Sequence, residues 1–441
     1  MNKQYWVDYA LSKGFENFEI FISSEKDKSI SWFDRKLDSY TNSAVTGYSF
    51  RGVFSGKMAV AASEDASDDT LSALIDSMIE QTKSITSEDV AELRRPESTE
   101  IIESSKKWVR PDYQTIENIL KSLEEKILAY DERFVQVSDL QWEESESKRE
   151  IFNSYGIDIE DRGVYQILFA SAAASDGKDV KNGYKVELVE DLSKFDQDAF
   201  VKDLCDKILH KLGASSIPSR HCPVIFDKDA MTALFSAFSG MYSGELISKG
   251  ISPLKDKFGK KIFSDKITII DNPKYSEMVS PYNYDDEGCP TREKFIVRNG
   301  MFETILQNTK TGKKMEMEST GNGFKGSYAS KVGVHPLGCY IVPGYSSLED
   351  LYKKMGSGLV ITTLEGLHAG LDHVTGDFSL QCAGYQIENG VRGKDVTLIT
   401  VAGNFIDLMN DVVEIGNDID WSYRSIVCPS IYFSNCAISG E

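Results

Sequence analysis

The chain has 441 residues, of which 41% are hydrophobic and 27% are charged. These fractions are ordinary for a globular protein, so they exclude wholesale disorder, and the length predicts about two to four domains. The formal net charge of −20 argues against direct nucleic-acid binding, because such binding depends on cations that neutralise phosphates.

The first half of the chain alternates helix and strand patterns that are punctuated by glycine turns. Helices are expected at 3–13, 68–84, 112–131 and 196–212, where apolar residues recur with helical spacing. Strands are expected at 18–22, 29–37, 44–53, 57–62, 135–142, 148–153, 156–162 and 164–175, with turns at 153–156 and 161–163. A charged, apolar-poor link at 86–112 separates two groups of elements. We therefore predict an N-terminal α+β domain at 1–100 and a middle α+β domain at 101–215.

The second half is richer in strands. A strand at 222–226 precedes an apolar helix at about 229–243. Two hairpins are expected further on, one at 295–306 with Asn299-Gly300 at its tip and one that starts at 385–390. We predict a β-rich C-terminal domain at 216–441. The whole pattern favours an α+β fold with antiparallel sheets over a doubly wound parallel sheet.

No stretch reaches the ~20 apolar residues that a membrane-spanning helix needs, and the first residues lack the apolar core of a signal peptide. The seven cysteines are scattered and form no C-x-x-C motif. This pattern favours reduced thiols in a cytoplasmic protein with no membrane partner.

Motifs of several enzyme classes are absent from the sequence. There is no G-x-S-x-G and no Walker-type phosphate loop. The string Gly321–Gly326 matches G-x-G-x-x-G, but the charged residues before it do not resemble a buried parallel strand. His368, His373 and Cys382 are suitable metal ligands by type. A spacing of five residues does not put His368 and His373 on one helix face. A metal site that uses them would therefore have to be formed by loops.

Several short motifs occur in a fixed order along the chain. They are Tyr48–Ala59, Gly356–Thr362, Gly376–Ser379, Gly384–Gly390, Ile399–Asn404 and Ile415–Ile419. Together with Ser319-Thr-Gly321 and the 295–306 hairpin, this ordered set resembles the TldD/PmbA family, formerly called modulators of DNA gyrase.

The resemblance implies one of two kinds of subunit. In that family, TldD-type chains hold a catalytic metal with an H-E-x-x-x-H helix and a later cysteine, whereas TldE/PmbA-type chains lack the motif, and the two form a heterodimeric metalloprotease that cleaves unfolded peptides. The motif positions fall here near Phe235, Ser236 and Gly240, none of which can ligate a metal or act as a base. Cys428 lies where the catalytic type keeps its cysteine, and we interpret it as a leftover or buried thiol.

The chain thus resembles a noncatalytic TldE/PmbA-type subunit that completes a substrate chamber. We expect no catalytic residue and no metal in this chain, a metal such as zinc in a TldD-type partner, and an unfolded peptide as substrate. In isolation the chain could also form a homodimer. Two alternatives stay open: a metallopeptidase with its metal at His368, His373 and Cys382, and a regulatory protein-binding module.

Two glycine-rich polar loops, 319–326 and 375–379, are candidates for peptide contact. Thr320, Asn322 and Asp377 could hydrogen-bond a peptide main chain, and Phe378 could offer an apolar platform. The plainer interpretation is that both loops are ordinary turns.

Overall fold

The computed structural model describes residues 2–86 and 90–441, so residues 87–89 of the predicted link lie outside the described residues. The chain combines helices with largely antiparallel sheets, and its C-terminal part is rich in strands, which confirms the predicted α+β class. No described helix is long and apolar enough to span a membrane.

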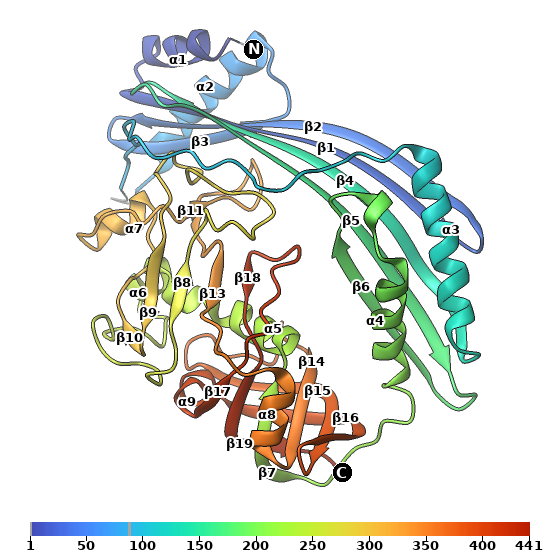
Figure 1. Cartoon of the computed structure of the whole chain (residues 1–441). Coiled ribbons are helices and arrows are strands. Elements are labelled where there is room, and N and C mark those ends of the chain that lie inside the picture. The colour runs from blue at the N-terminus through green and yellow to red at the C-terminus, as the bar shows by residue number, and fades with distance from the viewer. Residues whose placement is uncertain (1, 87–89) are drawn as a thin grey trace.

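A long, curved six-stranded sheet forms one side of the molecule (Figure 1). Its strands, in spatial order, are β3 (Lys57–Ser63), β2 (Lys36–Phe54), β1 (Asn17–Phe33), β4 (Phe134–Asn153), β5 (Asp158–Ser175) and β6 (Val180–Leu188). β1 pairs with β4 over its length, from Glu19 opposite Asn153 to Trp32 opposite Leu140. The boundary predicted near residue 100 therefore divides the sequence but not the sheet.

Several strands are longer than the sequence predicted. β1, β4 and β5 each cover two of the predicted strands, and the turn expected at 161–163 was wrong because these residues lie inside β5. The middle of β1 is polar and partly exposed, so it lacks an apolar signal, yet Ser24–Lys28 pairs on both sides, with β2 and with β4. Ladder hydrogen bonds can carry a strand through a segment that buries little apolar surface.

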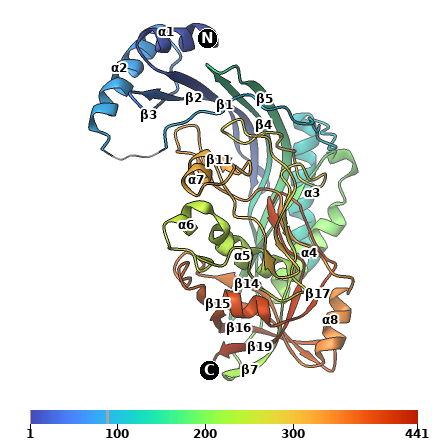
Figure 2. The ribbon, with the colours of Figure 1, turned by 90° about the vertical axis from the view of Figure 1, so that its left-hand side faces the viewer.

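Four helices flank the two ends of this sheet. α1 (Lys3–Ser12) and α2 (Asp68–Ser84) lie at one end, and α3 (Tyr113–Tyr130) and α4 (Gln197–Leu209) lie at the other (Figures 1 and 2). A side chain before each helix accepts a hydrogen bond from the first turn, as Ser67 does from Thr70 N and Asp112 from Thr115 N. The apolar stripes of the helices are buried against the sheet in two separate cores.

The C-terminal part contains a six-stranded, barrel-like sheet. Its strands are β16 (Val391–Asn404), β15 (Asp377–Glu388), β14 (Gly358–Glu365), β7 (Arg220–Phe226), β19 (Ile431–Ser439) and β17 (Val412–Ile415) in that order. A further pairing of β16 with β19 closes it. The helices α5 (Lys228–Phe238), α8 (Leu348–Met355) and α9 (Phe405–Asn410) contact this sheet, whereas the short helix α6 (Gly244–Ser248) contacts the short strands above it. The hairpin predicted at 385–390 is confirmed, with Asn389 and Gly390 at positive φ.

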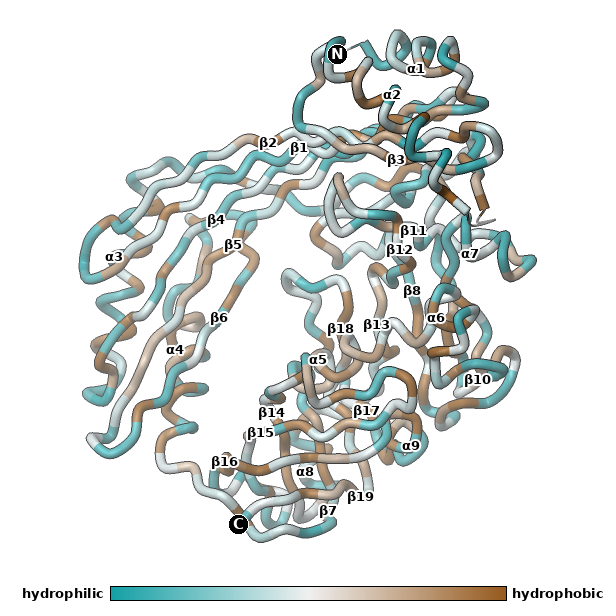
Figure 3. Tube along the Cα trace, turned by 180° about the vertical axis from the view of Figure 1, so that it is seen from behind, coloured by the Kyte–Doolittle hydropathy of each residue, from teal (hydrophilic) through white to brown (hydrophobic). Residues whose placement is uncertain are grey.

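Short strands lie between the barrel and the long sheet (Figure 3). A five-stranded sheet has the order β10 (Met301–Phe302), β9 (Lys294–Arg298), β8 (Ile269–Asp271), β13 (Cys339–Ile341) and β18 (Ile426–Val427). A two-stranded ribbon of β11 (Gly323–Phe324) and β12 (Gly333–Val334) and the short helix α7 (Thr309–Lys314) lie nearer the long sheet. The predicted turn at Asn299-Gly300 joins β9 to β10, with φ of 47° and 80°.

A loop after β11 packs on the long sheet through Tyr328. A Cβ atom added to Gly47 of β2 would lie 2.2 Å from atoms of the Tyr328 ring, and the Tyr328 hydroxyl donates to Glu64 Oε1 at 2.8 Å. We expect Gly47→Ala to lower the free energy of unfolding by about 1–3 kcal/mol, because the ring must move. Urea unfolding measures this change.

A double-mutant cycle provides the control for this prediction. Adding Tyr328→Ala to Gly47→Ala should cost less than the sum of the two single changes, since the clash is then gone. Gly326→Ala in the same loop should be nearly neutral, because its Cβ would meet nothing closer than 3.8 Å. Strictly additive effects of the two substitutions would show that this contact does not anchor the loop.

Candidate functional site

The helix on which the resemblance led us to expect the family's metal motif is α5. Asp227 begins it by accepting a hydrogen bond from Ala230 N at 2.8 Å. The predicted apolar stripe of Leu234, Phe235, Phe238 and Tyr242 is buried, as expected. The Phe235 ring lies 6.4 Å from that of Tyr242, which follows in the short 3₁₀ turn Ser239–Tyr242. α5 is thus a core helix between the barrel and the five-stranded sheet.

Cys428 lies beside this helix, just after β18. Its backbone N–H donates to Thr232 Oγ1 of α5 at 2.8 Å, and the residue is only 1% exposed. Burial raises the pKa of the Cys428 thiol well above its ordinary value. Burial also raises the pKa of Tyr242, with smaller contributions from the nearby thiols of Cys339 and Cys428. The Cys428 thiol is therefore neutral at physiological pH, and its thiolate form, which binds metals, is disfavoured.

The residues present around α5 do not fit a catalytic metal. Phe235 is fully buried, while Ser236 and Gly240 are half-buried and offer no imidazole or carboxylate. Within residues 2–86 and 90–441, no three histidine, cysteine, aspartate or glutamate side chains are grouped so that they could hold a metal ion. A metal-dependent step cannot be assigned to this helix.

The alternative ligand set is also not brought together. His368 and His373 lie exposed on the turns between β14 and β15. Cys382 lies on β15, is 2% exposed and belongs to the barrel core. Burial raises the pKa of the Cys382 thiol to about 12. The structure therefore places two surface imidazoles and one core thiol where a shared site was considered.

Residues 319–324 are buried, contrary to the exposed loop that peptide contact requires, whereas Lys325 is half-buried and Gly326 is exposed. Asn322 is fully buried, and its Nδ2 donates to Asp271 Oδ2 and to the His335 carbonyl oxygen, each at 3.0 Å. The Thr320 hydroxyl donates to Asn322 Oδ1 at 2.7 Å. Both side chains are satisfied inside the protein and hold the backbone of the loop.

The loop at 375–379 presents only one of its two candidates to solvent. Asp377 is exposed and accepts hydrogen bonds from Asn404 Nδ2 and the Thr375 hydroxyl. These hydrogen bonds lower the pKa of its carboxyl group. Phe378 is 4% exposed and packs in the barrel core, so it is not a surface platform. Contact of Asp377 with a peptide stays a prediction.

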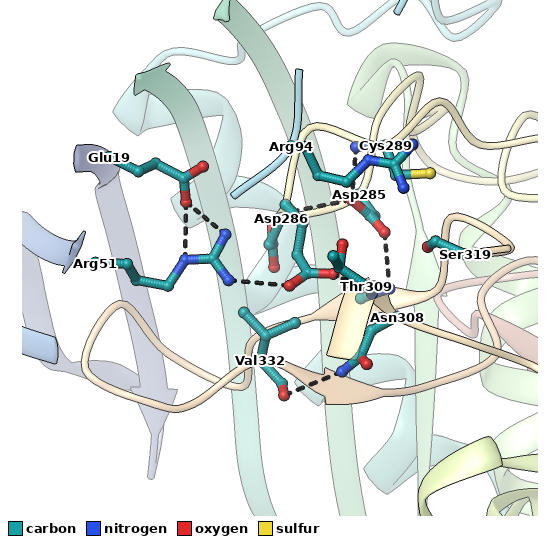
Figure 4. Close-up of polar contacts among 12 residues, drawn as sticks. Glu19, Arg51, Arg94, Asp285, Asp286, Cys289, Asn308, Thr309, Ser319 and Val332 are labelled. Atoms are coloured by element: carbon teal, nitrogen blue, oxygen red, sulfur yellow. Dashed lines mark hydrogen bonds and ion pairs between the residues drawn. The ribbon is translucent and has the colours of Figure 1, made fainter. Parts of the chain in front are cut away.

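A buried ionic cluster, absent from our sequence-based candidates, joins the long sheet to the central part of the chain (Figure 4). Arg51 of β2 donates to Glu19 of β1 and to Glu287, with its Nε 2.9 Å from Glu19 Oε1 and its Nη1 2.9 Å from Glu287 Oε1. The side chains of the three residues are 11%, 1% and 5% exposed. Glu287 Oε2 also accepts from Thr309 N at 2.7 Å. Charge and hydrogen bonds therefore dock the 285–309 region onto the sheet.

The neighbouring residues extend this cluster. Arg149 of β4 pairs with Asp161 and Asp286 at 2.6 Å each. Asp285 is fully buried and accepts backbone hydrogen bonds from Glu287, Cys289 and Gly323, each at 2.9 Å. The consecutive acidic residues 285–287 are the one signal in the sequence that could have indicated a buried ionic site.

Asp285 makes the stability of the fold depend on pH. Burial, followed by the charge of Glu287, raises the pKa of Asp285 from 3.8 to about 7. As the pH falls from about 7, the folded state takes up a proton that the unfolded state does not, so this contribution to stability grows. We expect Asp285→Asn to remove it, and the stability gap between wild type and variant to change by about 1–3 kcal/mol between pH 7 and pH 5. Urea unfolding at both pH values gives this gap, and an unchanged gap would contradict the assignment.

The chain is similar to known proteins over most of its length. Family models for domain 1, the central domain and the C-terminal domain of the PmbA/TldA metallopeptidases match residues 18–82, 106–212 and 219–440. The metalloprotease PmbA of Escherichia coli O157:H7 is 29% identical over 276 residues, which is 62% of this chain and 58% of that protein. The PmbA homologue of Haemophilus influenzae is 30% identical over 265 residues, or 59% and 56%. The aligned part thus spans little more than half the length of these curated relatives.

Two solved structures share the whole architecture. A protein of Thermotoga maritima described as a modulator of a DNA gyrase has a TM-score of 0.89 and 28% identity, over 99% of both chains. TldE of Thermococcus kodakarensis has a TM-score of 0.86 and 22% identity, also over 99% of both chains, and shows the fold alone. With three consecutive family models matched along its length, the chain belongs to the PmbA/TldD metallopeptidase family.

Proposed function

We propose that this chain is a noncatalytic subunit of the TldE/PmbA type. The resemblance leads us to expect the family's metal motif near Phe235, Ser236 and Gly240. The observation that supports the proposal is that α5, which bears Phe235 and Ser236, is packed in the core, while Gly240 follows it in a 3₁₀ turn. A zinc peptidase needs three protein ligands and a base at such a site. The similarity to relatives named metalloproteases supports a role in proteolysis all the same.

In this proposal the chemistry lies in a TldD-type partner that holds the metal. This chain completes the chamber in which an unfolded peptide is cleaved, and sheet edges bind its backbone, because main-chain hydrogen bonds accept many sequences alike. The complex is cytoplasmic, and the isolated chain could pair with a second copy. Neither a metal at His368, His373 and Cys382 nor a purely regulatory role is favoured by a specific contact.

Co-expression with a chain that carries H-E-x-x-x-H from the same genome tests the partnership. We expect the two chains to co-purify through a tag on either one and to elute together in size-exclusion chromatography. Separate elution at micromolar concentrations, with this chain behaving only as a monomer or homodimer, would overturn the proposed partnership.

A further inference from the structure

A pocket of about 640 Å³ lies beside the ionic cluster, between β2, β3, the end of α2 and the loop at 325–332. Its volume is typical of small-ligand sites. Among the described residues of its lining, cations outnumber carboxylates, although acidic residues prevail over the whole chain, 69 to 49. The cationic residues are Arg51, Lys57, Lys310, Lys325 and Lys331. We call this site the lysine pocket.

The two carboxylates of the lysine pocket are already paired. Glu287 binds Arg51 at 2.9 Å, and Glu92 binds Lys313, which does not line the pocket, at 2.9 Å. The Arg51 guanidinium in turn donates hydrogen bonds to Glu19 and Glu287. Of the lysines in the lining, Lys57 and Lys325 donate to neutral oxygens and not to carboxylates.

Lys325 is the most enclosed of these lysines. Its Nζ donates to Ser49 Oγ at 2.6 Å and to the Tyr328 carbonyl oxygen at 3.3 Å, and it lies 4.6 Å from the centre of the Phe21 ring. These partners are neutral, and burial, followed by the charge of Arg51, lowers the pKa of Lys325 to about 8. An anion beside it would supply counter-charge that the protein itself supplies only from a distance.

Lys57 is held in a similar way. Its Nζ donates to the carbonyl oxygens of Thr82 and Ile85 at the end of α2, at 3.1 and 2.6 Å. Part of the wall is apolar and comes from β3 and the loop, through Met58, Val60, Ala61 and Val332, and neutral polar side chains also line it, namely Ser49, Gln81, Asn308 and Ser330. Ammonium groups above an apolar wall suit a ligand with one anionic end and a carbon body.

We propose that the lysine pocket binds a carboxylate of a peptide, with Lys325 as its principal ammonium partner. The lysine side chains of the pocket are the reason to expect an anionic ligand. Only the choice of a peptide as the source of the carboxylate rests on the proposed function. The carboxylate can belong to the C-terminus of the peptide or to an acidic side chain, and the test separates the two.

Fluorescence anisotropy of the full chain with labelled peptides at low salt provides the test. One peptide has internal glutamates and a free C-terminus, a second has the same sequence with a C-terminal amide, and a third has glutamine for glutamate. We expect the first to bind, and binding to weaken with added salt. Loss of binding with the amide assigns the C-terminal carboxylate, and loss with glutamine assigns the side chain.

Substitutions locate the binding. Lys325→Met should weaken it by about tenfold or more, since a charge-assisted contact is lost. Lys331→Gln on the exposed rim, which spares the fold, should weaken it severalfold. Lys194→Met, whose side chain is 81% exposed and outside the lining, should leave it unchanged.

The proposal is overturned if no peptide binds, if a peptide that has both the C-terminal amide and glutamine for glutamate binds as well as the first, or if neither Lys325→Met nor Lys331→Gln changes the affinity. Its failure is separate from that of the proposed function. Complex formation with a catalytic chain is read by co-purification, whereas carboxylate binding is read on the isolated chain.

Discussion

Replacing Arg51 with methionine is expected to lower the free energy of unfolding by about 3–5 kcal/mol, because two buried carboxylates lose their counter-charge. Glu19 and Glu287 are 1% and 5% exposed, and both bind this one guanidinium. Burial already raises the pKa of Glu19, and Arg51 makes the largest contribution that opposes this shift. Urea unfolding of the purified chain measures the loss.

A surface ion pair in the same sheet is the matched control. Arg162 donates to Glu160 at 2.8 Å, but the side chains are 71% and 41% exposed, so Arg162→Met should cost at most about 1 kcal/mol. Adding Glu19→Gln and Glu287→Gln to Arg51→Met should restore part of the stability, since amides carry no charge to bury. An effect of Arg51→Met no larger than that of Arg162→Met would show that the cluster does not hold the sheet and the central part together.

Phe235→Ala is expected to destabilise the chain by about 3–5 kcal/mol, through lost burial and the cavity left behind. The Phe235 side chain is fully buried in the largest core of the molecule and faces Tyr242. If α5 serves here as a core helix and not as a metal-binding helix, the Phe235 side chain should contribute to the free energy of unfolding. Chemical denaturation of the variant gives the change.

Ser236→Ala at the next position is the control. Ser236 is half-buried, and its replacement should change the free energy of unfolding by no more than about 0.5 kcal/mol. If Phe235→Ala costs no more than Ser236→Ala, the apolar packing of α5 is not the reason that the motif is absent.

The longer helices follow closely from the sequence, whereas the short helices α6 to α9 were not predicted. The helix predicted at 68–84 is α2 to the residue, and the one predicted at 112–131 is α3 within one residue at each end. Both have a capping side chain directly before a regular apolar stripe, so local signals and tertiary burial agree. The two Asn-Gly hairpin tips were predicted for the same reason, since the dipeptide suits positive φ.

The long strands and the ionic cluster could not be predicted in this way. Ser24–Lys28 is held in β1 by backbone pairing with strands that lie far away in the sequence. Arg51 and Glu287 are 236 residues apart, so nothing local indicates their contact. Asn322 was expected at the surface because glycine-rich polar loops usually lie there. Instead Asp271, buried on β8, provides the partner that lets it enter the core.

Peptidase activity measured on three samples tests the central claim most directly. The samples are this chain alone, the H-E-x-x-x-H chain alone, and their complex, each incubated with an unfolded peptide and analysed for bound metal. The account predicts chelator-sensitive cleavage by the complex, unchanged when His368 and His373 of this chain are both replaced with alanine, and no cleavage by this chain alone. Chelator-sensitive cleavage by this chain alone that is abolished by His368→Ala and His373→Ala would contradict it.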